Sequence, residues 1–158
     1  MSFAIFLDID GVLNTRTTCE HTPDCHVGID DQRVAILAGA IRKYGPAEII
    51  LSSDWKELRP DEEDYLYLIS KLDKYGLKSA GKTTDHWNNR GEGILQYLES
   101  HPEIDEYVIL DDNIFDFQDY PKLWERLLIT NGIEKAEFAA ETPATEAILF
   151  RDYIREMG

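Results

Sequence analysis

Three apolar segments of this chain each stop abruptly at a cluster of carboxylate or hydroxyl side chains. The three junctions are Ala4–Leu7 with Asp8 and Asp10, Glu48–Leu51 with Ser52 and Ser53, and Glu106–Leu110 with Asp111 and Asp112. Short apolar runs bounded by polar residues are typical of buried strands. If the strands are parallel, their carboxyl ends share one edge of the sheet, where open α/β proteins bind ligands. A single cluster could be a turn or a helix cap, but three at successive strand ends indicate a site.

Helical patterns alternate with these strands. We expect one helix capped by Asp30 or Asp31 and ended by Gly45-Pro46, and others over Pro60–Lys74, from Arg90 to His101-Pro102, and from Thr142 to about Met157. Two more strands are expected over Leu77–Ala80 and Leu127–Thr130, with polar loops at Thr15–Gly28 and Gly81–Asn89. This alternation predicts an α/β fold with a mainly parallel sheet.

The length and charge of the chain exclude several classes of protein. With 158 residues, the chain fits a single domain, which we expect to cover residues 1–158. Its formal net charge of -15 repels polyanions, so extended nucleic-acid binding is not expected. No apolar run approaches the roughly 20 residues that span a bilayer, which argues against a membrane protein. The two cysteines, Cys19 and Cys25, are too few for a disulfide framework and favour a cytoplasmic location.

Asp8 and Asp10 place two carboxylates close together directly after the first strand. Such carboxylates repel each other, and a divalent cation is the simplest way to keep both ionised. Hard oxygen ligands favour Mg²⁺. Magnesium beside a free Asp carboxylate is suited to nucleophilic attack on phosphorus.

Four motifs in order resemble the haloacid dehalogenase (HAD) superfamily. They are Asp8-Ile9-Asp10-Gly11-Val12-Leu13, Ser52 after an apolar strand, a basic Arg90, and Asp111-Asp112 after a later strand. More narrowly, the segments 51–56, 90–94 and 108–112 look like the small HAD domains associated with RNA-repair proteins. The resemblance covers nearly the whole chain. It implies a three-layer Rossmann-like sheet of strand order 3-2-1-4-5 without a cap domain, a Mg²⁺ cofactor and phosphatase activity.

The resemblance also implies roles for individual residues. Asp8 would be the nucleophile that forms an aspartyl-phosphate, and Asp10 the general acid and base. Ser52 would bind a phosphoryl oxygen, and Arg90 would neutralise the charge on the phosphoryl group. The metal set would comprise Asp8, Asp10 through its main-chain carbonyl, and Asp112, with Asp111 as a supporting or alternate ligand. Ser53, Asn14, Lys56 and Lys82 are candidate substrate contacts, and Lys82 competes with Arg90 for the role of the basic residue.

The site is expected to be open, because Thr15–Gly28 is long enough only for a flap. An open site suits a large phosphorylated substrate, such as a nucleic-acid end or a phosphoprotein. Loop residues predicted at the same edge would supply a local basic rim: Arg16, Lys56, Arg59, Lys82 and Arg90. A catalytically inactive module of the same fold is the alternative to an enzyme. The sequence does not identify the substrate or the oligomeric state.

Overall fold

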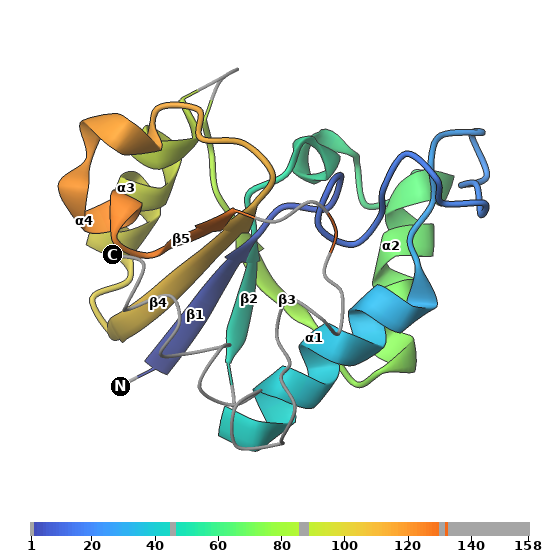
Figure 1. The fold of residues 1–158 in the computed structure, drawn as a ribbon, viewed down its shortest axis with the longest axis horizontal. Helices are drawn as coiled ribbons and strands as arrows, with labels where there is room; N and C mark the ends of the chain where they lie inside the picture. Colours follow the sequence, from blue (N-terminus) through green and yellow to red (C-terminus); the bar gives the residue numbers. More distant parts are fainter. Residues whose placement is uncertain (1, 45–46, 86–88, 130–131, 133–158) are drawn as a thin grey trace.

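A five-stranded parallel sheet forms the middle layer of the molecule (Figure 1). The structure is a computed structural model that describes residues 2–44, 47–85, 89–129 and 132. The strands are β1 (Ser2–Leu7), β2 (Glu48–Leu51), β3 (Ser79–Lys82), β4 (Ile104–Asp111) and β5 (Leu127–Ile129). All neighbouring pairs are parallel and the order is β3-β2-β1-β4-β5, which confirms the predicted topology.

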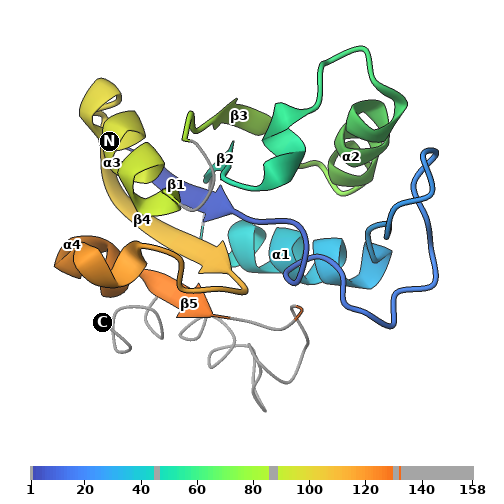
Figure 2. The ribbon, with the colours of Figure 1, turned by 90° about the horizontal axis from the view of Figure 1, so that it is seen from above.

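Helices cover both faces of the sheet, giving three layers (Figure 2). The α-helices on one face are α1 (Asp31–Tyr44) and α2 (Glu63–Lys74), and those on the other are α3 (Arg90–Ser100) and the four-residue α4 (Pro121–Trp124). Two short 3₁₀ helices, η1 (Asp54–Glu57) and η2 (Phe117–Asp119), follow the carboxyl ends of β2 and β4. None of the helices in the described ranges is both long and apolar enough to cross a lipid bilayer.

The central strand β1 is buried on both faces, which explains its uninterrupted apolar sequence. Ile5 and Leu7 belong to the core beneath α1 and α2, whereas Ala4 and Phe6 belong to the core beneath α3 and α4. Successive side chains of a strand point to opposite faces, so this single run supplies both cores. The polar residues that follow β1 therefore emerge from the middle of the sheet.

Strand β3 differs from its expected position by two residues. The apolar Leu77 is buried, but it belongs to the turn after α2, where its main-chain NH donates to the Leu72 carbonyl at 2.9 Å. The strand instead pairs Gly81 with Ile50 and Lys82 with Leu51, so these two residues lie in β3 and not in the expected loop. Pairing with β2, not local hydrophobicity, sets this edge strand. The helix expected from Thr142 to Met157 lies outside the described residues.

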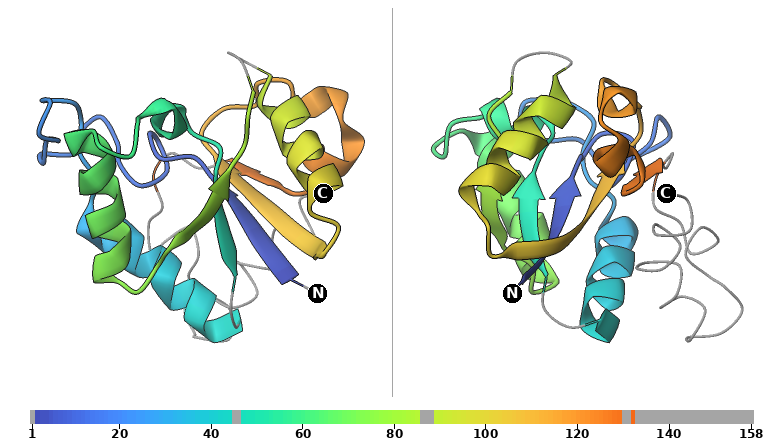
Figure 3. Two further views of the ribbon diagram at one scale, coloured as in Figure 1. Left: turned by 180° about the vertical axis from the view of Figure 1, so that it is seen from behind. Right: turned by 90° about the vertical axis from the view of Figure 1, so that its left-hand side faces the viewer.

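Neither the connection from β1 to α1 nor the connection from β2 to β3 holds a second domain within the described residues. The connection from β1 to α1 contains residues 15–28, which we call the flap, with a single antiparallel bridge between His21 and Val27. The connection from β2 to β3 holds only η1 and α2. Figure 1 and the left panel of Figure 3 both show the flap beside the first turns of α2.

Candidate active site

The polar strand ends meet at one edge of the sheet. The parallel hydrogen-bond ladder continues past the strands: the Asp8 NH donates to the Leu110 carbonyl at 2.9 Å, and the Ser52 NH donates to the Leu7 carbonyl at 3.0 Å. Asp111 is the last residue of β4. Side chains separated by about a hundred residues in sequence are therefore held on adjacent, rigid strands.

Three carboxylates converge at this edge. One oxygen from each of Asp8, Asp111 and Asp112 can be chosen so that all lie within 4.8 Å of one another. Asp8 and Asp111 are buried, while Asp112 is exposed. Gly11 makes the approach of Asp112 possible, because a Cβ built on Gly11 would lie 2.2 Å from Asp112 Oδ2. Gly11 also has a φ of +82°, which other residues rarely adopt.

Arg90, the first residue of α3, is the cation of the cluster. Its Nη1 lies 3.1 Å from Asp8 Oδ1 and 2.8 Å from Asp111 Oδ2. Its guanidinium carbon lies 4.3 Å above the centre of the Phe115 ring, which fixes the plane of the group. The structure thus brings Arg90, rather than Lys82, into contact with Asp8.

The electrostatics of the cluster leave negative charge uncompensated. Burial raises the pKa of Asp8 to about 9, with Asp111 and Asp112 acting in the same direction and Arg90 opposing them. Burial also raises the pKa of Asp111 to about 6, against the effect of Arg90. One guanidinium does not offset three neighbouring carboxylates. The donor set is made of hard oxygens, so the residues present fit a Mg²⁺ ion.

Ser52 and Ser53 have different surroundings although they are adjacent in sequence. Ser52 is fully buried and its Oγ has no hydrogen-bond partner in the described part of the chain. Ser53 Oγ accepts a hydrogen bond from the Trp55 NH at 3.2 Å and so caps η1. A buried hydroxyl without a partner is costly unless a ligand satisfies it. Ser52 therefore has a free hydroxyl for an incoming oxygen, whereas Ser53 already has a structural role.

Asp10 is exposed and held by two donors. Asn14 Nδ2 donates to Asp10 Oδ1 at 3.0 Å, and Trp55 Nε1 donates to the same oxygen at 3.2 Å. The remaining polar groups of the Asn14 amide bind the main chain of Gly11 and Gly28. Asn14, expected as a substrate contact, thus holds the flap and Asp10 in place. The Asp10 carboxylate is not part of the group of three, so its predicted metal contact would use the main-chain carbonyl.

The expected basic rim is assembled only in part: Arg90 lies in the cluster and Arg16 lines the pocket beside it, but the three other residues have different partners. Lys56 is buried and forms an ion pair with Asp85, and its Nζ also donates to Thr83 Oγ1 at 3.2 Å. Lys82 donates to the Lys56 carbonyl at 3.0 Å, and Arg59 pairs with the neighbouring Asp61. Lys56 therefore connects η1 to the loop after β3 and does not belong to a rim. No local sequence pattern predicts this pairing, because Lys56 and Asp85 are 29 residues apart.

A pocket of about 690 Å³ lies directly beside the cluster. It extends from Asp10 and Asp112 between the flap and the segment that carries η1 and the start of α2. The flap is anchored to α2 by Asp64, whose carboxylate accepts hydrogen bonds from Thr22 Oγ1 at 2.8 Å and from the Asp24 NH at 3.0 Å. Sequence reasoning missed this anchor, because an acidic residue in the first turn of a helix is common without any tertiary partner.

A three-layer parallel sheet with this cluster at its carboxyl edge is the arrangement expected of a HAD-type phosphatase. The chain belongs to a particular family within that class: the model of the HAD domain in Swiss Army Knife RNA repair proteins matches residues 4–134. This confirms the predicted family and the predicted kind of enzyme.

No curated protein matches the chain. A solved structure from Vibrio cholerae, assigned as a 3-deoxy-D-manno-octulosonate 8-phosphate phosphatase, is similar over 100% of this chain and 87% of that chain. The two sequences are 15% identical and the TM-score is 0.49.

Proposed function

We propose that the protein is a Mg²⁺-dependent phosphomonoesterase that works through an aspartyl-phosphate on Asp8. The observation that carries the proposal is the contact of Asp8 with Arg90, within the group of carboxylates that includes Asp111 and Asp112. A buried carboxylate flanked by a guanidinium and a metal can approach a phosphoryl group without strong repulsion.

The reaction would have two steps. A carboxylate oxygen of Asp8 attacks phosphorus as the bond to the ester oxygen breaks, and Asp10 donates a proton to that leaving oxygen. Asp10 then removes a proton from a water molecule, which attacks phosphorus and breaks its bond to Asp8. Inorganic phosphate leaves, and Asp8 and Asp10 return to their starting states.

Two groups would bind the phosphoryl oxygens during both steps. Ser52 Oγ and Arg90 Nε are buried and lack partners in the described part of the chain, so each can donate to an incoming oxygen. Asp8, Asp112 and the main-chain carbonyl of Asp10 would hold Mg²⁺, with Asp111 as a supporting or alternate ligand. The cation would supply charge neutralisation between the Asp8 carboxylate and the phosphoryl group.

The test is hydrolysis of a generic aryl phosphate with Mg²⁺ and with EDTA. Turnover should require Mg²⁺, and Asp8→Asn should lower kcat by at least about 10³-fold, because no nucleophile remains. Circular dichroism should show that the variant keeps its fold. Substantial residual turnover in Asp8→Asn would refute the nucleophilic role, and absence of turnover on any ester would favour an inactive binding module.

A phosphorylated nucleic-acid end is a second candidate substrate, and a phosphoprotein is a third. The nucleic-acid end is supported by the description of the matching family as RNA repair proteins. Its test is the comparison of a free nucleotide with the same nucleotide at the end of an oligonucleotide. Equal hydrolysis of the two would count against it.

We also propose a cytoplasmic location, supported by the two free, exposed cysteines Cys19 and Cys25.

A further inference from the structure

We propose that the pocket between the flap and the start of α2 binds the leaving group of the substrate and selects leaving groups that are uncharged or cationic. The inference rests on the proposed phosphomonoesterase function. Asp112 of the cluster and Asp10, the proposed acid and base, both line the pocket, so the pocket begins where the ester oxygen of a bound phosphomonoester would lie. A group attached to that oxygen would extend into the pocket.

The walls of this pocket are built before any ligand binds. Tyr67 in α2 accepts a hydrogen bond from the Ile29 NH at 2.9 Å and contacts Glu20 of the flap. Lys71 pairs with Glu20 at 2.5 Å, and Asp64 binds Thr22 as described above. The flap is therefore tied to α2 at several points along its length. A preformed wall loses little conformational entropy when a ligand binds.

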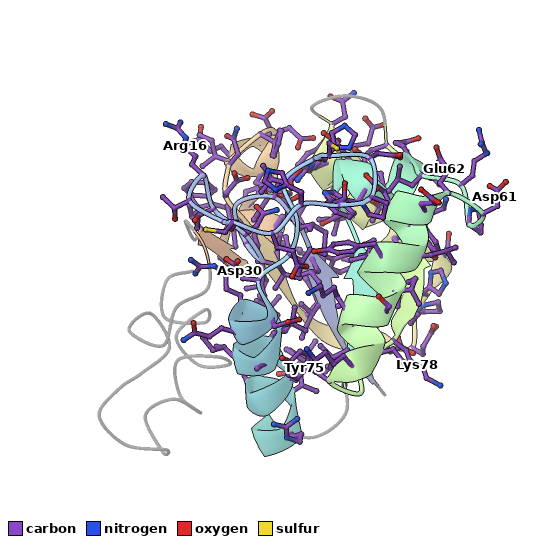
Figure 4. The ribbon with its side chains drawn as sticks, turned by 90° about the vertical axis from the view of Figure 1, so that its right-hand side faces the viewer. Arg16, Asp30, Asp61, Glu62, Tyr75 and Lys78 are labelled. Atoms are coloured by element: carbon purple, nitrogen blue, oxygen red, sulfur yellow. The ribbon has the colours of Figure 1, made fainter. Side chains whose placement is uncertain are left out.

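Negative charge dominates the lining. Six carboxylates line the pocket, against one arginine, Arg16, and one histidine, His26. Asp64 is paired with His26, Asp112 belongs to the cluster, and Asp10 is the proposed acid and base. The other three acidic groups along the path of the leaving group are Asp24, Glu62 and Asp54, of which Asp54 also lies 3.5 Å from Arg90 Nη2. Figure 4 shows Glu62 at the start of α2 and Arg16 at the far end of the flap, so Arg16 does not offset Glu62.

The lining also has an apolar part. Trp55, Leu58 and Val27 contribute to the wall, and Val27 is 41% exposed. An apolar surface beside hydrogen-bond acceptors fits a compact organic group that carries hydroxyl or ammonium donors. It does not fit a chain of further phosphates, each of which would be repelled by the carboxylates.

The test uses three aryl phosphates that differ only in a distant substituent: 4-(2-aminoethyl)phenyl, 4-ethylphenyl and 4-(2-carboxyethyl)phenyl phosphate. Their phenols are similar leaving groups, so the three esters have similar intrinsic reactivity and differ mainly in the charge of the distant substituent. With the Mg²⁺-loaded protein, kcat/KM should be highest for the cation and about tenfold lower for the anion than for the neutral ester. The differences should shrink at high salt, because partly exposed charges are screened.

Variants locate the effect in the pocket. Asp24→Asn combined with Glu62→Gln should bring the three kcat/KM values closer together, because two of the carboxylates that distinguish the esters by charge are removed. The matched control is Asp61→Asn, because Asp61 is next to Glu62 but does not line the pocket, and Figure 4 shows it on the outer side of the loop. This control should leave the selectivity intact. If the double variant does not fold, the salt dependence of the wild-type kcat/KM values tests the charge selectivity of the pocket instead.

The outcomes separate this inference from the proposed function. Hydrolysis of all three esters at equal rates, or faster hydrolysis of the anion, would overturn the inference and leave the phosphatase function standing. Absence of hydrolysis of any ester would overturn both the proposed function and the inference. Preference for an oligonucleotide end over its free nucleotide would also overturn the inference, because the oligonucleotide leaving group carries additional negative charge.

Discussion

Trp55 is a buried residue of the core that also contacts the proposed acid and base, Asp10. Its side chain is 7% exposed, and its indole NH reaches Asp10 from η1, on a different strand connection. Asn14 donates to the same carboxylate oxygen, so the other oxygen of Asp10 is left for proton transfer. Two donors on one oxygen fix the orientation of the proposed acid and base.

Replacing Trp55 by Phe tests this orientation, because the variant keeps an aromatic ring, although a smaller one, and loses the indole NH. We expect kcat/KM for an alkyl phosphate to fall about tenfold, since a poor leaving group needs a well-placed acid. The value for 4-nitrophenyl phosphate should change much less, because that leaving group departs without a proton. Steady-state kinetics on both esters checks this, and an equal loss on both would indicate a general packing defect.

At the scale of elements, the flap depends on Asp64. Burial raises the pKa of Asp64, but hydrogen bonds from Asp24, His26 and Thr22 outweigh it and hold the pKa below its ordinary value. A lowered pKa in the folded state means that the ionised carboxylate stabilises the fold. That contribution is fully present above the pKa of Asp64 in the unfolded chain, near 3.8. It is lost as the pH falls through the lower pKa of Asp64 in the folded protein.

Asp64→Asn should lower the free energy of unfolding by about 1–3 kcal/mol at pH 7, because buried donors lose a charged acceptor. Urea unfolding measures this, and the difference from wild type should shrink at acid pH. Limited proteolysis should cut the flap of the variant, residues 15–28, faster than that of the wild type. Asp61→Asn is the control, and an equal effect of both substitutions would argue against a specific anchor.

The pair of Lys56 and Asp85 joins η1 to the loop that leads toward α3. Both side chains are 4% exposed, so removing one partner leaves a buried charge. Lys56→Met should destabilise the protein by about 3–5 kcal/mol, and the double variant with Asp85→Asn should recover part of that loss. Urea unfolding of both variants checks the coupling. Additive effects would show that the two residues do not act as a pair.

At the scale of the whole molecule, the carboxylate cluster links stability to pH. The pKa of Asp8 is about 9 in the folded protein, against 3.8 for an ordinary Asp. A raised carboxyl pKa means that the folded state holds a proton that the unfolded state releases. In metal-free protein, the stability associated with Asp8 should therefore be lost as the pH rises from about 4 to about 9.

Asp8→Asn removes this titration, so the variant should gain stability relative to the wild type as the pH rises across that range in EDTA. Urea unfolding of both proteins at pH 5 and pH 8 measures the difference. Mg²⁺ should reverse the order by binding the wild-type cluster in its folded state. An identical pH dependence of the two proteins in EDTA would contradict the proposed burial of Asp8.

The sequence predicted much of the fold, because the signals for it are local. Apolar runs and helical patterns predicted the alternation of strands and helices, and the polar ends of the strands placed Asp8, Ser52 and Asp111 at one edge. The strand order was implied by the resemblance to the HAD superfamily. The same signals left Lys82 as an alternative to Arg90, since both are basic residues between Ser52 and Asp111. The single domain over residues 1–158 stays a prediction.

By itself, then, the sequence determined the alternation of strands and helices and the polar residues at the strand ends, because each depends on neighbouring residues. Only the tertiary structure decided which long-range partners meet: Lys56 with Asp85, Asp64 with the flap, and Trp55 with Asp10. Those pairings depend on where loops 29 to 45 residues apart come together on the folded sheet, and hydrophobic periodicity carries no information about that.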